Sequence, residues 1–375
     1  MIKAAIDGSD RYSLLVRHGS RYQAYMRRTF QLLGQELQFS RGFPTGVDGQ
    51  GRTPLHYAAA GGYDEAVDHI LKWPNSVSDV NMVWGHAKWT PICEAIRRNN
   101  RTIYRSLLAH EADPMVKVDS PAYNGRLDWG LLHLAAQFVL GDDLTIASDL
   151  MIRGVQLDDY GTKNDFAESP LSVAIEHDHF KLATKLREAG ANVDAVSRHL
   201  LGGRMMSKYP VTILGRVIAT NIRHSQHRLK YMLYPDDSLA SCAAPDFIVV
   251  PSKGYTALHW AVMQDRLEET AELDEDVKHT ILDIVMERFD TPEEIDRRVP
   301  DTGDTALHIA YRNSDTWAVN KLIDVYEADT SIRNNDGLTP SEAAPTCSGP
   351  SRPQGPELQV LQEMKDLLLI VTSLP

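Results

Sequence analysis

Histidine is the chemically versatile side chain that recurs most regularly in this sequence. Four histidines occupy the same position of a repeated sequence pattern, namely His56, His133, His259 and His308. Histidine is the commonest general base and metal ligand near neutral pH, so a recurring histidine first suggests a catalytic or metal site. Each of the four lies in a separate copy of the pattern. We therefore expect them to lie in separate structural units and interpret them as structural residues.

Two other histidine clusters are weaker candidates for chemistry. His177 and His179 are two residues apart, and side chains at that spacing on a helix point in different directions. His224 and His227 are three apart and flanked by arginine, so a helical face would bring them together over an anion. The phosphate-binding, zinc-protease and nucleophile-elbow motifs do not occur in the sequence. The sequence predicts no metal and no cofactor, and identifies no catalytic residue.

Composition and charge restrict the environment and the partners. The three cysteines are far apart in the sequence, which favours a reducing compartment over a disulfide framework. No run of about 18 apolar residues occurs, so we expect no membrane association. The formal net charge of −12 disfavours nucleic-acid binding, which needs cations to replace the counterions of phosphate. We expect an intracellular protein, cytoplasmic in the first instance, with the nucleus not excluded.

The histidines belong to a pattern that sets the fold. The pattern reads GRTPLHYAAAGG from Gly51, GYTALHWAV from Gly254 and GDTALHIAY from Gly303, with weaker copies between them. A Thr or Ser in most copies is suited to cap a helix through its side-chain oxygen, and a proline often follows where its missing N–H costs nothing. The small apolar residues behind it allow two short helices to pack closely. This pattern resembles the ankyrin repeat.

The resemblance implies an all-α ankyrin-repeat solenoid of stacked helix–turn–helix units with long inter-repeat loops. The turn residues follow one another at spacings of 34 to 49, against about 33 in a regular array. The irregular array is similar to those common in filamentous fungi. We expect N-terminal capping helices or a degenerate repeat over residues 1–47, and seven to eight repeats over 48–345. A Pro/Ser/Gly linker is expected over 346–357 and a C-terminal capping helix over 358–375.

Two rows of residues are the expected binding surface, because the ankyrin family places its variable contacts there. The first row precedes the turn residue of each repeat: Arg52, Trp89, Trp129, Glu168, Tyr255 and Asp304. The second row follows the first helix: Arg97, Arg98, Gln137, Phe138, Glu176, His177, Met263, Gln264, Arg312 and Asn313. Tryptophan, tyrosine and arginine dominate binding hot spots. The first-row position should face solvent, unless the long loops fold back over Trp89 and Trp129 and make them local core.

Two functions remain in competition on the sequence alone. The first is a scaffold or adaptor that binds a protein partner through its concave groove and finger loops, because stacked repeats offer a preformed surface. The alternative is an enzyme on the ankyrin frame, which would transform a small molecule in a groove pocket closed by the long inserts. A narrow pocket enclosed by Trp89, Trp129, Phe138 and Arg97 would favour the enzyme. An open groove would favour the adaptor.

Overall fold

The computed structural model divides the chain into two compact units, unit 1 over Met1–Asn164 and unit 2 over Asp165–Pro375. It describes residues 51–72, 80–119, 128–160, 168–197, 200–201, 204–205, 211–220, 222–233, 245, 255–264, 280–289 and 291–345. The predicted N-terminal caps (1–47), linker (346–357) and C-terminal helix (358–375) all lie outside these residues.

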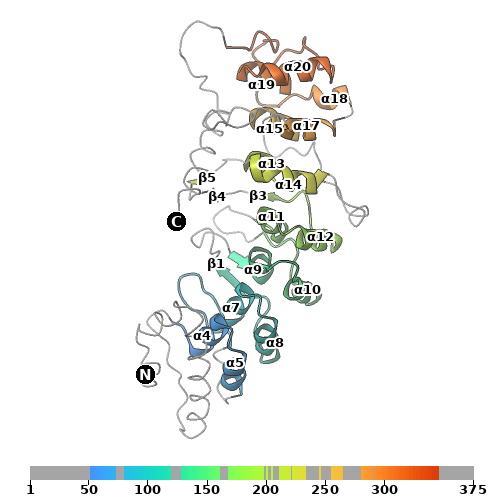
Figure 1. Ribbon diagram of the computed structural model, residues 1–375. Helices are drawn as coiled ribbons and strands as arrows, with labels where there is room; N and C mark the ends of the chain where they lie inside the picture. Colours follow the sequence, from blue (N-terminus) through green and yellow to red (C-terminus); the bar gives the residue numbers. More distant parts are fainter. Residues whose placement is uncertain are drawn as a thin grey trace. The chain divides into compact units, whose positions relative to one another are not determined.

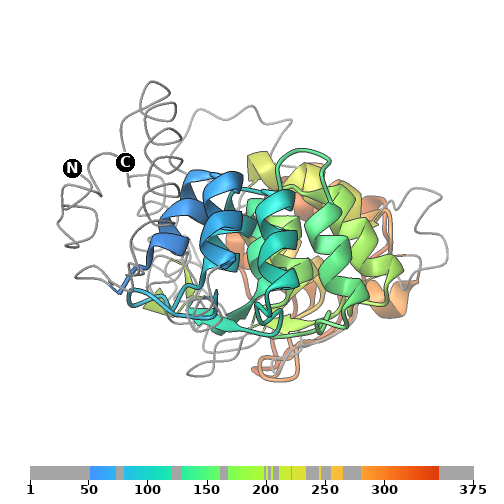
Figure 2. The same cartoon turned by 90° about the horizontal axis from the view of Figure 1, so that it is seen from below.

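The described residues of unit 1 form three helix pairs and a short pair of antiparallel strands. Its elements are α4 (Pro54–Gly61), α5 (Asp64–Leu71), α7 (Pro91–Arg97), α8 (Arg101–Ala109), β1 (Lys117–Asp119), β2 (Asp128–Gly130), α9 (Leu131–Phe138) and α10 (Thr145–Ile152). The first helices of the pairs, α4, α7 and α9, pack in one row, and their partners α5, α8 and α10 pack in a second (Figure 1; Figure 2 shows the helices from below).

Unit 2 repeats the same arrangement with more variation. Its elements are α11 (Pro170–Glu176), α12 (Phe180–Glu188), β3 (Val196–Ser197), β4 (Leu200–Leu201), β5 (Arg204–Met205), β6 (Val211–Thr212), α13 (Ile213–Thr220), α14 (Ile222–Leu233), α15 (Ala257–Gln264), α17 (Thr280–Met286), α18 (Pro292–Ile295), α19 (Ala306–Asn313) and α20 (Thr316–Asp324). The first-helix row includes α13, α15 and α19, which pack on one another in that order. The helices α14, α17 and α20 each pack against the first helix of their own pair.

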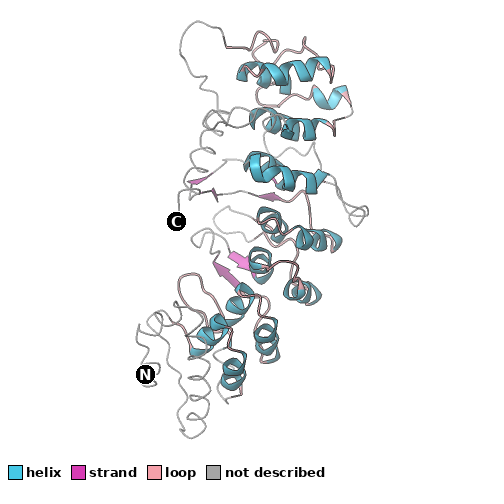
Figure 3. Cartoon of the chain, viewed as in Figure 1, coloured by secondary structure: helices cyan, strands magenta, loops and turns pink. Residues whose placement is uncertain are grey.

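The long inserts contain short β structure that the all-α prediction did not specify (Figure 3). β1 pairs antiparallel with β2, and Val118 lies opposite Trp129. β3 pairs with β6 and β4 with β5, also antiparallel. An isolated bridge joins Trp84 to Trp89. These pairs hold the chain extended immediately before a first helix, which fixes the residue that precedes each turn.

Each helix is short, and burial of its small apolar face stabilises it. In α4 the buried residues include Leu55, Ala58 and Ala59, and α9 buries Leu131, Leu134 and Ala136. Isolated helices of this length are marginal in water, so packing against the next pair supplies most of their stability. The apolar residues at the repeated positions therefore determine how successive helix pairs pack on one another. Among the described residues, no helix is long and apolar enough to cross a membrane.

Candidate functional site

The repeated histidines cap the helices, as the sequence predicted. The backbone N–H of Thr53 donates to Nδ1 of His56 (3.2 Å), so the proton of the neutral ring is on Nε2. That Nε2 in turn donates to the backbone carbonyl of Trp89 in the next repeat (3.2 Å). His308 does the same with Thr305 (3.2 Å) and with the carbonyl of Leu338 (3.0 Å). These rings fasten one repeat to the next and have no nitrogen available for catalysis.

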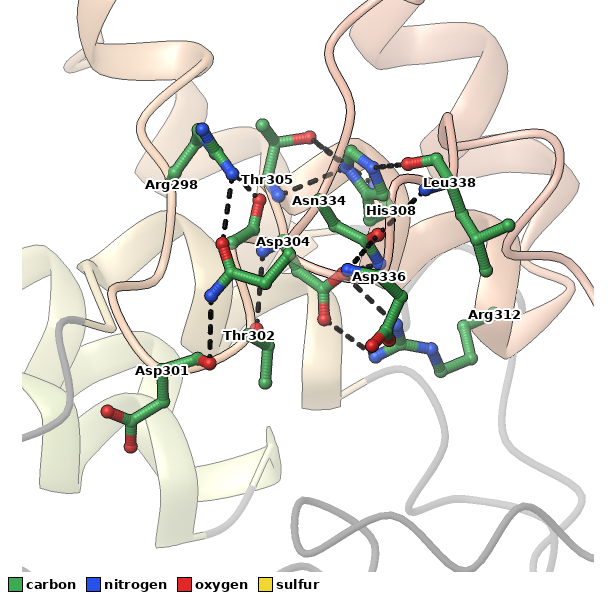
Figure 4. Close-up of polar contacts among 12 residues, drawn as sticks. Arg298, Asp301, Thr302, Asp304, Thr305, His308, Arg312, Asn334, Asp336 and Leu338 are labelled. Atoms are coloured by element: carbon green, nitrogen blue, oxygen red, sulfur yellow. Dashed lines mark hydrogen bonds and ion pairs between the residues drawn. The ribbon is translucent and has the colours of Figure 1, made fainter.

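The position before the turn residue holds a buried carboxylate in two repeats of unit 2. The carboxylate of Asp304 accepts hydrogen bonds from Nη1 (2.8 Å) and Nη2 (3.0 Å) of Arg312 and from Nδ2 of Asn334 (2.9 Å), as Figure 4 shows. Burial alone would raise the pKa of Asp304, but the hydrogen bonds from Arg312 and Asn334 outweigh it and hold that pKa below its ordinary value. The cluster therefore holds a fixed ion pair within the α19 repeat and joins that repeat to Asn334 of the next one.

Glu168 is the second such carboxylate and has a similar partner. Its Oε1 accepts from both Nη1 and Nη2 of Arg216 on α13 (3.1 Å each), and Arg216 also forms an ion pair with Glu176 at the end of α11. Both Glu168 and Arg216 are buried. A buried pair of this kind fixes the register of the repeats, because either charge alone would be costly in the interior.

Most of the predicted first row does not face solvent. For Trp89 and Trp129 this is the second of the two alternatives that the sequence left open, whereas for Glu168 and Asp304 it differs from the expected exposure. Trp89 is 6% exposed and Trp129 1%, while Glu168 and Asp304 are completely buried. Trp129 stacks on His133 (ring centroids 5.6 Å apart, planes at 15°), and Trp89 contacts Phe138 edge-on. The two tryptophans are therefore local core, because their rings pack on neighbouring aromatic side chains.

The remaining predicted residues are distributed between interior and surface. Arg52 is half-buried, with its guanidinium 3.5 Å from the ring centroid of Trp84, and Tyr255 is half-buried against His259. Met263 of the second row is buried, which corrects its assignment to the surface. His177 is exposed and lies 5.9 Å from the ring of His179. Whether any of them contacts a partner stays a prediction.

The second-row residues of unit 1 lie at one end of the helix pairs, where three turns are fastened side by side. Nδ2 of Asn100 donates to Oδ1 of Asp64 (3.0 Å), which joins the α7–α8 turn to the start of α5. Nδ2 of Asn99 donates to Oδ2 of Asp143 (3.1 Å), and Arg101 forms an ion pair with the same carboxylate. Two hydrogen-bonded links thus hold the α4–α5, α7–α8 and α9–α10 turns in fixed positions.

We call the large side chains of these three turns the turn surface of unit 1. It consists of Tyr63, Arg98, Phe138 and Leu140. The side chain of Leu140 is 63% exposed, which is unusual for leucine, and Arg98 is exposed as well. Tyr63 and Phe138 are half-buried. Burial raises the pKa of the Tyr63 hydroxyl, and the positive charge of Arg98 acts against that rise, which places Arg98 near Tyr63.

The sequence identified only half of this surface. Arg98 and Phe138 belong to the predicted second row, whereas Tyr63 and Leu140 were missed. Both lie beside a turn glycine that has positive φ, Gly62 and Gly141. A large apolar or aromatic residue next to such a glycine is a signal that could have been found in the sequence, because turns normally carry small or polar residues. Among the described residues, no group of three or more His, Cys, Asp or Glu side chains is placed to hold a metal ion.

Comparison with known proteins agrees with the repeat geometry. A family described as ankyrin repeats in three copies matches residues 22–118, of which 51–72 and 80–118 are described by the structure. This part of the chain therefore contains ankyrin repeats. No curated protein sequence matches it.

Two solved structures similar to this ankyrin-repeat protein are themselves ankyrin repeat domains. The ankyrin repeat domain of Bcl-3, described as a unique member of the IkappaB family, is 17% identical with a TM-score of 0.38, over 85% of this chain and 99% of that one. The ankyrin repeat domain of human ASB11 is 17% identical with a TM-score of 0.45, over 72% of this chain and 98% of that one.

Proposed function

We propose that this ankyrin-repeat protein is an adaptor that binds a protein partner through the turn surface of unit 1. Ankyrin repeat domains are in general protein-interaction modules. The observation that carries the proposal is the exposure of Leu140 beside Arg98 and Phe138, in turns that are already fastened by hydrogen bonds. Aromatic and arginine side chains are enriched in interface cores, and Leu140 adds exposed apolar area beside them.

The rigidity of the turns supports a binding role. Asp143 receives hydrogen bonds from Asn99 and Arg101, and Asp64 receives one from Asn100, so the backbone that presents the surface is held from both sides. A partner that binds such a surface loses little additional conformational entropy in ordering it. A mobile loop with the same side chains would bind more weakly.

The enzyme alternative finds less support in the positions of its residues. It needs Trp89, Trp129, Phe138 and Arg97 to line a pocket. Trp89 and Trp129 are buried instead, and Arg97 forms an ion pair with Glu94 (2.8 Å). The side chains that would face a substrate are therefore already engaged in packing or pairing. A small-molecule ligand has no support from these contacts, and binding of a protein is the function that we favour.

Affinity capture from an extract of the source cells tests the adaptor proposal. The full chain is compared with a variant that carries Leu140→Ser and Phe138→Ser. We expect the double variant to lose specific proteins that the unaltered chain recovers. Ile152→Ser is the matched control, because Ile152 is 85% exposed in α10 of the same unit but outside the three turns.

The control separates loss of the surface from loss of folding. The circular dichroism spectrum and urea midpoint of each variant should remain close to those of the unaltered chain, since the altered side chains are wholly or partly exposed. Equal recovery of every protein by all three chains would show that the turn surface is not the contact. If only Ile152→Ser loses the captured proteins, the interface lies on the row of second helices instead.

A further inference from the structure

We propose that the turn surface of unit 1 recognises a partner segment that carries a carboxylate next to an aliphatic side chain. This inference rests on the proposed adaptor function and specifies the chemistry of the partner. It is carried by the charges of three arginines at the α7–α8 turn, by the apolar side chains next to them, and by two buried polar atoms that have no hydrogen-bond partner.

The three arginines differ in whether their charge is already paired. Arg97 donates to Oε2 of Glu94 (2.9 Å from Nε), and Arg101 pairs with Asp143. Arg98 lies between them in the chain and is exposed, and its guanidinium makes no hydrogen bond or ion pair with any residue that the structure describes. Asp142, the exposed carboxylate of the neighbouring turn, has an interaction of its own that does not involve Arg98. One positive charge at this turn is therefore available to an anionic group of a partner.

The apolar side chains next to Arg98 indicate what should accompany that anionic group. α7 and α9 pack in the same row, so Arg98 after α7 and Phe138 at the end of α9 occupy corresponding ends of neighbouring helices. Leu140 follows Phe138 by two residues and is the more exposed. An aliphatic side chain laid on Leu140 and Phe138 would remove apolar surface from water and shield the ion pair at Arg98.

Two buried polar atoms near Phe138 match a peptide group. Nε1 of Trp89 and Oε1 of Gln137 are both buried and lack a hydrogen-bond partner. Trp89 is more than nine-tenths buried and contacts Phe138 edge-on (centroids 6.4 Å apart), and Gln137 precedes Phe138 in α9. A buried indole N–H without an acceptor is destabilising, so an acceptor supplied by a partner would be favourable. A partner segment that packs on Leu140 and turns the ring of Phe138 aside would offer one backbone carbonyl to Trp89 and one backbone N–H to Gln137.

Selection from a random peptide library displayed on phage tests the inference with the full chain as bait. We expect the enriched peptides to share an Asp or Glu within two residues of Leu, Ile, Val or Phe. A synthetic peptide of the enriched sequence should bind about tenfold more weakly to Arg98→Ala. Replacing its acidic residue by lysine should abolish binding to the unaltered chain and restore binding to Arg98→Glu.

Arg105→Ala is the matched control, because Arg105 is an exposed arginine of the same unit that lies within α8. It should leave the affinity of the peptide unchanged. The indole Nε1–H resonance of Trp89, assigned by its absence in Trp89→Phe, should shift when the peptide binds. That signal distinguishes contact at Phe138 from a general effect of charge.

Three results would overturn the inference. Enriched peptides without an acidic residue would show that binding needs no ion pair with Arg98. Equal affinity of the peptide for Arg98→Ala and the unaltered chain would show that the peptide binds elsewhere. A library that yields no enriched peptide would contradict the recognition of a short acidic segment. None of these results decides the adaptor proposal, which fails only if the capture experiment recovers the same proteins with and without Leu140 and Phe138.

Discussion

The two units bury opposite kinds of side chain at the same position of the repeat. Before the turn residue, unit 1 has Trp89 and Trp129, and unit 2 has Glu168 and Asp304. All four are buried. The tryptophans are held by aromatic packing, whereas the acids are held by arginine: Arg216 for Glu168 and Arg312 for Asp304.

The difference shows that the residue before the turn residue is buried in both units, but that this residue can be either aromatic or acidic. A tryptophan there needs only apolar and aromatic neighbours. A carboxylate needs a cation and further hydrogen-bond donors, and loses stability if any of them is absent. We therefore expect unit 2 to depend on single polar residues more strongly than unit 1 does.

Breaking the Asp304 cluster should have the largest effect on stability. Asp304→Leu leaves Arg312 and Asn334 without their acceptor in a mostly buried site. Loss of one partner of a buried pair typically costs about 3–5 kcal/mol, and we expect about 3 because part of Arg312 remains exposed. Urea titration with pulse proteolysis, which resolves cleavage in unit 2, gives the change in its free energy of unfolding.

Two variants bracket this result. Arg333→Ala removes an ion pair with Glu342 in which both side chains are at least half exposed, and should cost less than about 1 kcal/mol. Trp89→Phe in unit 1 removes the indole N–H but keeps an aromatic ring, and should cost less than half as much as Asp304→Leu. If Trp89→Phe proves the more destabilising, the contrast between the units is wrong.

Lowering the pH should reduce the stability of unit 2, because His259 is buried in its neutral form. Burial lowers the pKa of His259 from 6.5 to about 4, although backbone hydrogen bonds to Asp304 and Arg297 act against that fall. The unfolded chain therefore binds a proton that the folded chain does not between pH 6.5 and 4. Stability contributed by neutral His259 is complete above pH 6.5 and falls by about 3 kcal/mol as the pH drops to 4. Urea midpoints of unit 2 at pH 7.5, 6, 5 and 4 measure the loss.

His259→Asn is the control for the acid effect. It removes the titrating ring, so unit 2 should be less stable at pH 7.5 but should lose less stability on acidification. An unchanged dependence on pH in this variant would assign the effect to the carboxylates instead. Asp304 is one of them, since its lowered pKa makes its contribution disappear as the pH falls through that pKa.

The smallest effect concerns the turn residue of the third helix pair. Gly130 stands where other repeats have Thr or Ser, and an added Cβ would lie 2.9 Å from Oδ2 of Asp159, which pairs with Lys117. Gly130→Thr would supply a capping hydroxyl, yet we expect a loss of about 1 kcal/mol rather than a gain, because Asp159 must move. Combining it with Asp159→Ala should recover the gain, as a double-mutant cycle would show. A stabilising single variant would contradict this account.

The sequence predicted the repeats well because each repeat is a local unit. The turn residue, the proline and the small apolar residues of α4 or α7 lie within a dozen residues of one another, and their helical periodicity is visible directly. The histidines are similar, since His56 caps a turn only three residues away. The proposed turn surface was predicted less well, because the exposure of Leu140 and the partial exposure of Tyr63 depend on how three separate turns are fastened together.

By itself the sequence therefore determined the helix pairs, their order and the structural role of the repeated histidines. The tertiary structure decided what the sequence left open, namely that Trp89 and Trp129 are core, that Glu168 and Asp304 are buried with arginine, and that Arg98 is the one unpaired arginine of its turn among the described residues. The reason is physical. Helix formation and capping depend on neighbours in the chain, whereas burial and charge pairing depend on side chains tens of residues away, which only the packing of successive repeats brings together.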